Sequence, residues 1–82
     1  MSLHEVLLPD LGIDDQPITA SSWLVKRGTR VTEDDPVLEV LCGGATVDLP
    51  AMVRGILVKK LVAEDENIKV GQALAVIETP DE

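Results

Sequence analysis

The sequence predicts an all-β fold, either a sandwich or a barrel, and two observations support this. Apolar residues do not recur at helical spacing over any window of about 11 residues, and turn residues interrupt the chain too often for helices. Short apolar runs instead follow one another at close and regular intervals, which is typical of the strands of all-β domains. The runs span residues 4–8, 18–25, 37–42, 45–49, 52–62 and 73–78.

A loop separates the first two predicted strands. The run 4–8 ends at Pro9, which lacks the backbone N–H that a continuing strand needs. Residues 10–17 contain a glycine, adjacent aspartates and a proline, and this composition indicates a surface loop. The run 18–25 ends in Trp-Leu-Val, which favours a strand, and Gly28 then turns the chain.

The middle of the chain predicts a hairpin. The charged stretch 32–36 ends in Asp-Asp-Pro and makes a turn before the run 37–42. Gly43 and Gly44 separate that run from residues 45–49, where apolar and polar side chains alternate weakly. A two-residue hairpin loop favours a type I′ turn with positive φ at both positions, and glycine adopts positive φ at little steric cost.

The last part of the chain predicts two further strands. The run 52–62 contains Gly55, which indicates a bulge or bend inside the strand. The charged stretch 63–67 makes the next turn, Gly71 marks another, and residues 73–78 form the final strand.

An internal repeat relates the two halves, with Leu24 recurring 37 positions later as Leu61. Both halves follow the order strand, charged turn, short apolar residue, second turn, strand. The matched positions are Leu24–Val25 with Leu61–Val62, Val31 with Ile68, Val37 with Leu74, and Val40 with Ile77. Two similar halves usually pack around a pseudo-twofold axis, each covering the apolar face of the other.

Length and composition bound the possible functions. The 82 residues suffice for one small domain, which we place at residues 1–79, with residues 80–82 as the start of a linker or tail. The core must be aliphatic, because the chain has one Trp and neither Phe nor Tyr. No apolar run approaches the roughly 18 residues that a membrane span needs, so no membrane partner is expected.

The net charge of −8 argues against nucleic-acid binding, because such a surface repels phosphate backbones. A single aromatic residue also leaves no platform on which bases could stack. The acidic surface favours either solubility alone or attraction to a basic protein partner.

Cys42 is the only cysteine, so the chain can form no internal disulfide, in keeping with a reducing, cytoplasmic location. A reactive thiol needs a nearby cation or a helix N-terminus, and neither flanks Cys42. Strand alternation places it on one face with Leu38 and Val40, so we expect a small buried hydrophobe there. A thiol carrier is the alternative.

The other candidate residues have structural interpretations, and no catalytic residue or metal ligand is expected. His4 is alone beside Glu5, whereas a metal site needs several converging ligands. Trp23, as the only large ring, is expected in the core rather than as a partner anchor. The acidic groups Asp34–Asp35 and Glu64–Asp65–Glu66 are expected in exposed turns, and Lys26, Lys59, Lys60 and Lys69 as solvated surface charges.

Four stretches share their order and spacing with one known family. They are LLPDLG at 7–12, WLVKRGTRVTEDDPVLEV at 23–40, ATVDLPAMVRGIL at 45–57 and LVAEDENIKVGQALAVIE at 61–78. Together they resemble the biotinyl/lipoyl carrier domains over nearly the whole chain. The resemblance implies a flattened β-barrel of two four-stranded antiparallel sheets with pseudo-twofold symmetry.

The resemblance is closer to lipoyl than to biotinyl domains. Biotinyl domains carry Met-Lys-Met in the hairpin, whereas lipoyl domains carry Asp-Lys-Ala before a strand like Thr-Val-Glu-Val-Pro. The stretch from Ala45 to Pro50, ATVDLP, follows the lipoyl form. The pattern is most similar to lipoyl domains of 2-oxo acid dehydrogenase acyltransferase components, which stand before a flexible linker.

The same resemblance places the family's attachment lysine at Gly44 and the preceding aspartate at Gly43. Lipoate and biotin are joined through an amide to a lysine ε-amine, and glycine has no such nucleophile. Shifting the alignment does not help, because no lysine occurs between Lys26 and Lys59. We therefore expect no cofactor on this chain, although the family carries lipoate. The change is natural or engineered, and a natural origin is favoured because both positions differ.

The resemblance implies two functions and disfavours a third. The first is a docking or structural module that binds other subunits of a 2-oxo acid dehydrogenase-type complex through the loop from Leu11 to Asp15 and the hairpin from Cys42 to Ala45. The second is an inactive copy within a dihydrolipoamide acyltransferase whose swinging arm is carried by a sibling lipoyl domain. A free-standing enzyme lacks a catalytic constellation, and we expect the isolated domain to be monomeric.

Overall fold

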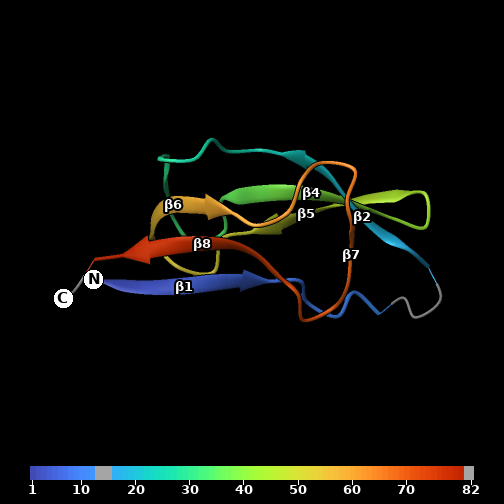
Figure 1. Ribbon diagram of the computed structural model, residues 1–82, viewed down its shortest axis with the longest axis horizontal. Helices are drawn as coiled ribbons and strands as arrows, with labels where there is room; N and C mark the ends of the chain where they lie inside the picture. Colours follow the sequence, from blue (N-terminus) through green and yellow to red (C-terminus); the bar gives the residue numbers. More distant parts are fainter. Residues whose placement is uncertain (13–15, 81–82) are drawn as a thin grey trace.

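The computed structural model describes residues 1–12 and 16–80, which form eight β-strands (Figure 1). The strands are β1 (Ser2–Leu7), β2 (Ile18–Trp23), β3 (Arg30–Val31), β4 (Pro36–Cys42), β5 (Ala45–Pro50), β6 (Gly55–Lys60), β7 (Asn67–Ile68) and β8 (Ala73–Thr79). The predicted all-β fold is confirmed. None of the described residues belongs to a helix long and apolar enough to span a membrane.

The strands form two four-stranded sheets in which all neighbours are antiparallel. Sheet A has the order β1–β8–β6–β3, and sheet B has the order β5–β4–β2–β7. The molecule measures 41 × 20 × 19 Å. The β4–β5 hairpin lies at one end of the long axis, and both chain ends lie at the other (Figure 1).

The internal repeat of the sequence is also a repeat of the structure. A shift of 37 positions converts β2, β3 and β4 into β6, β7 and β8. The pairing is conserved with it: Ala20 pairs with Val40 in sheet B, as Leu57 pairs with Ile77 in sheet A. Each of these pairs is followed by the same irregularity in register. The two sheets are therefore equivalent, with β1 of sheet A taking the place of β5 of sheet B.

The turns repeat as closely as the strands. The backbone N–H of Leu24 donates to the carbonyl oxygen of Val37 at 2.9 Å, and Leu61 donates to Leu74 at 2.9 Å. Ala51 and Asp35 form a hydrogen bond of 2.8 Å that joins the end of β5 to the turn before β4. The corresponding bond from Leu8 to Gln72 measures 3.0 Å and joins the end of β1 to the turn before β8.

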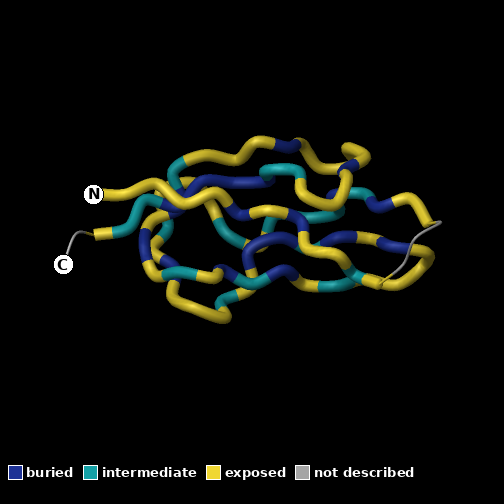
Figure 2. Tube along the Cα trace, turned by 90° about the horizontal axis from the view of Figure 1, so that it is seen from below, coloured by how far each residue is buried: buried dark blue, intermediate teal, exposed yellow. Residues whose placement is uncertain are grey.

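The core is aliphatic, as predicted, and consists of two clusters. The larger contains Leu8, Ile18, Ala20, Leu38, Val40, Cys42, Leu49, Val62, Ile68 and Leu74. The smaller contains Val6, Val31, Val37, Ala51, Leu57, Ala75 and Ile77, and each of these has a symmetry counterpart in the larger cluster. Figure 2 shows buried positions concentrated along the strands and exposed positions in the turns at both ends.

Gly55 corrects one expectation, because it does not mark a bulge. It is the first residue of β6 and pairs with Val31, while the irregularity lies further on, between Leu57 and Lys59. A Cβ on Gly55 would collide with the carbonyl oxygen of Glu78 and would lie 2.8 Å from a methyl carbon of Ile77. Glycine is needed here because β8 passes close to the backbone.

One strand boundary and two short strands also differ from expectation. The run 52–62 yields a strand only over residues 55–60, since residues 52–54 form a bend before it. The sequence indicated no strand at residues 30–31 or 67–68, where β3 and β7 form. Two residues are too few for an alternating pattern, so only the pairing with β6 and β2 defines these strands.

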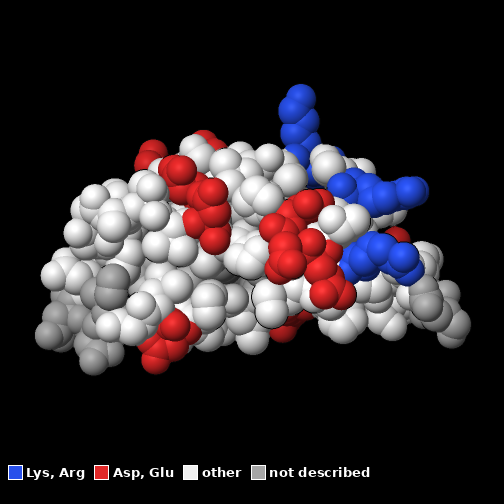
Figure 3. Space-filling view, turned by 180° about the vertical axis from the view of Figure 1, so that it is seen from behind, with Lys and Arg blue, Asp and Glu red and all other residues white. Residues whose placement is uncertain are grey.

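Charge is distributed unevenly over the surface. On the face shown in Figure 3, the Lys and Arg side chains lie toward the end with the chain termini. The Asp and Glu side chains on that face lie mainly over the middle and toward the hairpin end. On this face, the acidic surface expected from the net charge of −8 therefore lies beside a group of basic side chains.

Candidate functional site

The β4–β5 hairpin is the candidate site, and its turn is set by two glycines. Cys42 pairs with Ala45, which leaves Gly43 and Gly44 as the only loop residues. Their φ angles are 59° and 86°, so both are positive. Positive φ at both central positions is the type I′ arrangement predicted from the sequence, and it matches the twist of the flanking strands. The hairpin is therefore closed tightly without any side chain at its tip.

The space around the tip differs between the two glycines. A Cβ on Gly44 would meet no atom within 4 Å, so a side chain at this position would project into open space. A Cβ on Gly43 would lie 3.1 Å from the Cγ of Gln16 and 3.3 Å from its Cδ. Gln16 is exposed, so its side chain can move aside by the few tenths of an ångström that a larger residue requires. The tip can therefore accommodate side chains that the sequence does not provide.

Cys42 lies directly below the tip but faces the interior. Only 1% of its surface is exposed, and it belongs to the larger core cluster together with Leu38 and Val40. It pairs with Ile18 of β2 on one side and with Ala45 of β5 on the other. The predicted role as a small buried hydrophobe is confirmed. A buried thiol cannot reach a partner at the hairpin tip, so the thiol-carrier alternative finds no support.

The loop beside the hairpin leads to Gln16, which lies next to Gly43 and was not identified from the sequence. Leu11, half-buried, packs against the larger core cluster, and Gly12 donates its N–H to Asp10 Oδ1 at 2.8 Å. The remaining part of the predicted recognition loop, residues 13–15, lies outside the described residues. Gln16 is the residue beside Gly43, and no local pattern could identify it because the contact joins positions far apart in sequence.

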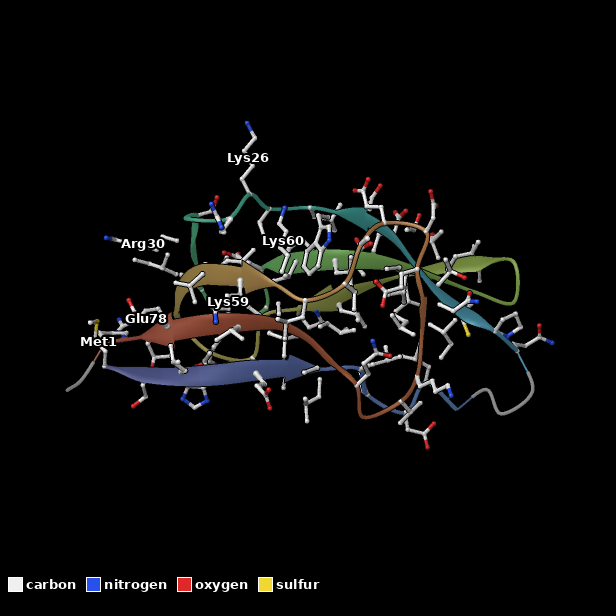
Figure 4. The ribbon with its side chains drawn as sticks, in the orientation of Figure 1. Met1, Lys26, Arg30, Lys59, Lys60 and Glu78 are labelled. Carbon is white, nitrogen blue, oxygen red and sulfur yellow. The ribbon has the colours of Figure 1, made fainter. Side chains whose placement is uncertain are left out.

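Three of the chain's four lysines lie in the half of the molecule away from the hairpin tip. Figure 4 shows Lys26, Lys59 and Lys60 in the half of the molecule that contains the chain termini. Lys69 is nearer, since it follows Ile68 of β7. However, β2 separates β7 from β4, which places the two strands about 10 Å apart. None of these amines occupies the position of Gly44.

Trp23 joins the two core clusters rather than forming an exposed anchor. It is half-buried and packs against both clusters. Its indole N–H donates to the carbonyl oxygen of Val62 at 3.1 Å, and its backbone N–H donates to Glu64 Oε2 at 2.9 Å. The Nζ atom of Lys60 lies 5.2 Å from the ring centroid, within the range of a cation–π interaction. The expectation that Trp23 packs in the core is thus confirmed in part.

The acidic turns have structural roles. Asp35 Oδ2 accepts the backbone N–H of Thr32 at 2.9 Å, and Glu66 Oε1 accepts that of Ala63 at 3.0 Å. Asp34 and Asp65 each adopt φ of 73°, a conformation that aspartate tolerates better than most residues. Among residues 1–12 and 16–80, no group of three or more His, Cys, Asp and Glu side chains could hold a metal ion. His4 is exposed on β1.

The molecule has two pseudo-symmetric sheets, with a protruding type I′ hairpin at one end and the chain ends at the other. This arrangement defines the class of barrel-sandwich carrier domains. The family model described as "Biotin-requiring enzyme", which covers biotin and lipoyl attachment domains, matches residues 4–77, so the chain belongs to this family. The lipoyl domain of the 2-oxoglutarate dehydrogenase complex from Azotobacter vinelandii has the same fold. That structure matches with a TM-score of 0.75 and 16% identity, covering 94% of this chain and 98% of its own.

Several acyltransferase components are similar in sequence. The lipoamide acyltransferase component of the branched-chain alpha-keto acid dehydrogenase complex from Bacillus subtilis is 29% identical over 96% of this chain and 19% of its own length. The dihydrolipoyllysine-residue acetyltransferase components of the pyruvate dehydrogenase complexes from Mycobacterium tuberculosis and Zymomonas mobilis are 37% and 38% identical, over 85% and 89% of this chain. The chain spans only 13% and 17% of their respective lengths.

Proposed function

We propose that this chain is a lipoyl-domain module of a 2-oxo acid dehydrogenase acyltransferase-type protein that does not itself carry lipoate or biotin. The observation that carries the proposal is the hairpin tip, which has the open geometry of a carrier position but glycine in place of an amine. The residues present therefore do not fit a covalently attached lipoyl group. The family membership and the acyltransferase relatives support the first part of the proposal.

The chemistry of attachment explains why the glycine matters. A lipoyl or biotinyl group is held by an amide whose nitrogen comes from a lysine side chain. The attacking group must be an unhindered amine that a ligase can reach. Gly44 has no side chain, and the buried thiol of Cys42 faces the core. Lys69 follows β7, which is separated from β4 by β2.

The proposed role is docking or structural. The hairpin from Cys42 to Ala45 and the loop from Leu11 to Asp15 would form the surface that other subunits of the complex recognise. This assignment is supported by Gln16, which directly follows the loop and lies beside Gly43 at the tip of the hairpin. A module of this kind would keep the shape of a lipoyl domain while it transfers no acyl group.

A second candidate is an inactive copy within a functional dihydrolipoamide acyltransferase, whose swinging arm is carried by a sibling lipoyl domain. This candidate is kept because the chain spans only 13–19% of the lengths of these acyltransferase relatives. Sequencing the gene beyond residue 82 distinguishes the two. An acyltransferase domain together with a lysine-bearing lipoyl domain supports the sibling arrangement, and an immediate stop codon contradicts it.

Ligase treatment tests the central claim. Incubation of the chain with a lipoyl ligase, lipoate and ATP should leave its intact mass unchanged. The double variant Gly43→Asp/Gly44→Lys should gain the mass of one lipoyl group, because the side chain at position 44 projects into open space. Positive φ at both positions should cost this variant about 1 kcal/mol per residue, which fold-sensitive fluorescence of Trp23 will register.

The matched control is Gly43→Asp/Gly44→Arg, which restores charge and bulk without an amine that can form the amide. It should remain unmodified. A mass gain in the unchanged chain would refute the proposal. Failure of a folded Gly43→Asp/Gly44→Lys variant to be modified would instead contradict the placement of the carrier position at residue 44.

A further inference from the structure

The β4–β5 turn divides the chain into two halves with the same succession of strands. The first half, residues 1–42, contains β1 to β4, and the second half, residues 45–80, contains β5 to β8. Only Gly43 and Gly44 link them along the chain. In each half the second and fourth strands pair with each other, β2 with β4 and β6 with β8. The hairpin tip is thus the boundary between two structurally equivalent units.

Neither half completes a sheet by itself. The other four strand pairs, β1–β8, β2–β7, β3–β6 and β4–β5, each join one half to the other. Among the described residues, β1 and β3 of the first half have neighbours only in β8 and β6 of the second. Both core clusters likewise contain residues of both halves, such as Val40 with Leu74 and Val31 with Leu57. Each half therefore needs the other to bury its apolar face.

The two-residue link has the properties of a hinge. Gly43 and Gly44 adopt φ of 59° and 86° in the closed turn, and glycine adopts an extended conformation just as readily. A Cβ on Gly44 would meet no atom within 4 Å, and a Cβ on Gly43 would first meet the exposed side chain of Gln16. Straightening the two glycines would therefore separate the halves without altering the turns inside either half.

We propose that the chain exchanges halves with a second copy of itself, with Gly43 and Gly44 as the hinge. In the exchanged dimer, the first half of each copy pairs with the second half of the other, so both lobes repeat the strand pairs and core contacts of the monomer. Only the two turns are lost. Dilution favours the closed monomer, because the linked half is always close, and a rising concentration favours the dimer. The proposal goes beyond the proposed function, since it does not depend on what residue 44 can carry.

The identity of the partner follows from contacts that the monomer already makes. Between β1 and β8, for example, the register runs from Ser2 with Thr79 to Leu7 with Ala73. A second copy supplies the same strand with the same side chains, so exchange requires no new complementarity. Closed monomers that associate through the outer edges of β1 or β5 would instead use new contacts. This is the alternative that the experiment must separate from exchange.

The test compares two valine substitutions at glycines of equal geometry. Gly44 and Gly71 both adopt φ of 86°, and a Cβ on either would meet no atom within 4 Å. Gly44→Val disfavours the closed turn, because a β-branched residue rarely adopts positive φ, and this cost disappears when the hinge extends. Gly71→Val is the matched control, since Gly71 lies in a turn inside the second half that is the same in the monomer and the exchanged dimer.

The unchanged chain and both variants are unfolded in urea, refolded at a series of concentrations and analysed by sedimentation equilibrium. The dissociation constant of the dimer should be at least about tenfold lower for Gly44→Val than for the unchanged chain, and Gly71→Val should stay within about twofold of it. Trp23 fluorescence reports whether each variant folds. Where a valine variant does not fold, Gly44→Ala and Gly71→Ala repeat the comparison with a smaller steric cost.

A pair of cysteine variants distinguishes exchange from ordinary association. Ser2 of β1 lies opposite Thr79 of β8, and the spacing of antiparallel strands is within the reach of a disulfide. Ser2→Cys and Thr79→Cys, each added to Gly44→Val, are refolded together under reducing conditions and then oxidised. By mass spectrometry, the mixed disulfide should exceed either homodisulfide at least about fivefold, because exchange sets β1 of one copy beside β8 of the other. Cys42 is 1% exposed in the fold that both forms share and should stay reduced.

Each other outcome overturns the proposal. Absence of a dimer at every concentration, or equal dissociation constants for Gly44→Val and Gly71→Val, would show that the glycine pair is not a hinge. Mixed disulfides and homodisulfides in equal amounts would show that closed monomers associate through their surfaces. None of these results involves lipoylation, so failure of the exchange is distinguishable from failure of the proposed function.

Discussion

Residues 18–42 and residues 55–79 build the same unit of three strands and two turns, yet they distribute side chains differently. Each strand of the first unit has its counterpart 37 positions later, with the same pairing and the same irregularity in register. The side chains differ at most of these positions, so the backbone hydrogen bonds preserve the unit while packing and charge vary between its two versions.

In the core, large and small residues exchange places between the two halves. Ala20 occupies the position equivalent to Leu57, and Leu38 occupies the position equivalent to Ala75. All four side chains are essentially buried. The first half thus has its small residue on β2 and its large residue on β4. The second half has its large residue on β6 and its small residue on β8. The two halves therefore fill the core together, and the side-chain volume at one position is not repeated at the equivalent position of the other half.

The turns exchange glycine and aspartate in the same way. Gly28 adopts φ of 91° and its counterpart Asp65 adopts 73°, whereas Asp34 adopts 73° and its counterpart Gly71 adopts 86°. Each half therefore needs positive φ in both of its turns and supplies it with one glycine and one aspartate. Both residue types are suited to this conformation, glycine because it lacks a Cβ and aspartate because its short side chain bonds locally.

Removal of a large core residue from either half should have the largest effect. Leu57→Ala and Leu38→Ala should each lower the free energy of unfolding by about 3 kcal/mol, since both delete a fully buried side chain in a small core. Urea denaturation followed by Trp23 fluorescence measures this. Leu61→Ala, at a 45% exposed position, should cost less than about 1 kcal/mol. A large loss in one half only would break the equivalence of the two.

The second prediction concerns Gly55, where the second half has no room for the side chain that the first half carries at the equivalent position. Gly55→Ala should destabilise the protein by about 2 kcal/mol, because its Cβ would collide with the carbonyl oxygen of Glu78. The equivalent position of the other half carries Ile18 without difficulty. Gly55 does not have positive φ, so its loss comes from the collision, whereas Gly12→Ala, where a Cβ would meet nothing, measures the cost of positive φ without a collision. Unchanged stability of Gly55→Ala would show that β8 can move away.

A smaller effect is expected from the turn carboxylate of the first half. Asp35→Ala should cost about 1 kcal/mol, because the backbone N–H of Thr32 loses its acceptor. Asp35→Gln should cost less than about 0.5 kcal/mol, since Gln72 accepts the N–H of Lys69 at 3.0 Å in the equivalent turn. Thermal unfolding of both variants checks this. Equal losses would mean that the negative charge, rather than the hydrogen bond, stabilises the turn.

The smallest effect should come from exchange of the turn residues. Asp34→Gly should change the unfolding free energy by no more than about 0.5 kcal/mol in the stabilising direction, because relief of positive φ is offset by the greater freedom of glycine in the unfolded chain. Gly28→Asp should lose a similar amount. Chemical denaturation with replicate midpoints can resolve both, and a loss above 1 kcal/mol from Asp34→Gly would contradict the interchangeability of the two turns.

The sequence allowed prediction of those parts of the fold that depend on local pattern. The apolar runs located six strands, and Gly43–Gly44 identified the hairpin turn because few other pairs adopt positive φ twice in succession. The short strands at residues 30–31 and 67–68 could not be found, because pairing with distant partners defines them. The role of Gly55 was misjudged for the same reason, since its constraint comes from Glu78 on another strand.

The candidate site was predictable to the same extent. An exposed glycine tip followed from the hairpin pattern, and burial of Cys42 followed from alternation along its strand. The approach of Gln16 to Gly43 was not predictable, because it depends on the path of the preceding loop.

The position of Trp23 has a practical consequence. Trp23 and Lys60 are counterparts in the repeat, and they stack on each other, which places the indole at the seam between the two units. Because the chain has no other aromatic residue, its ultraviolet emission arises from this seam alone. Time-resolved quenching of that emission would therefore time the separation of the two units during unfolding without any attached dye.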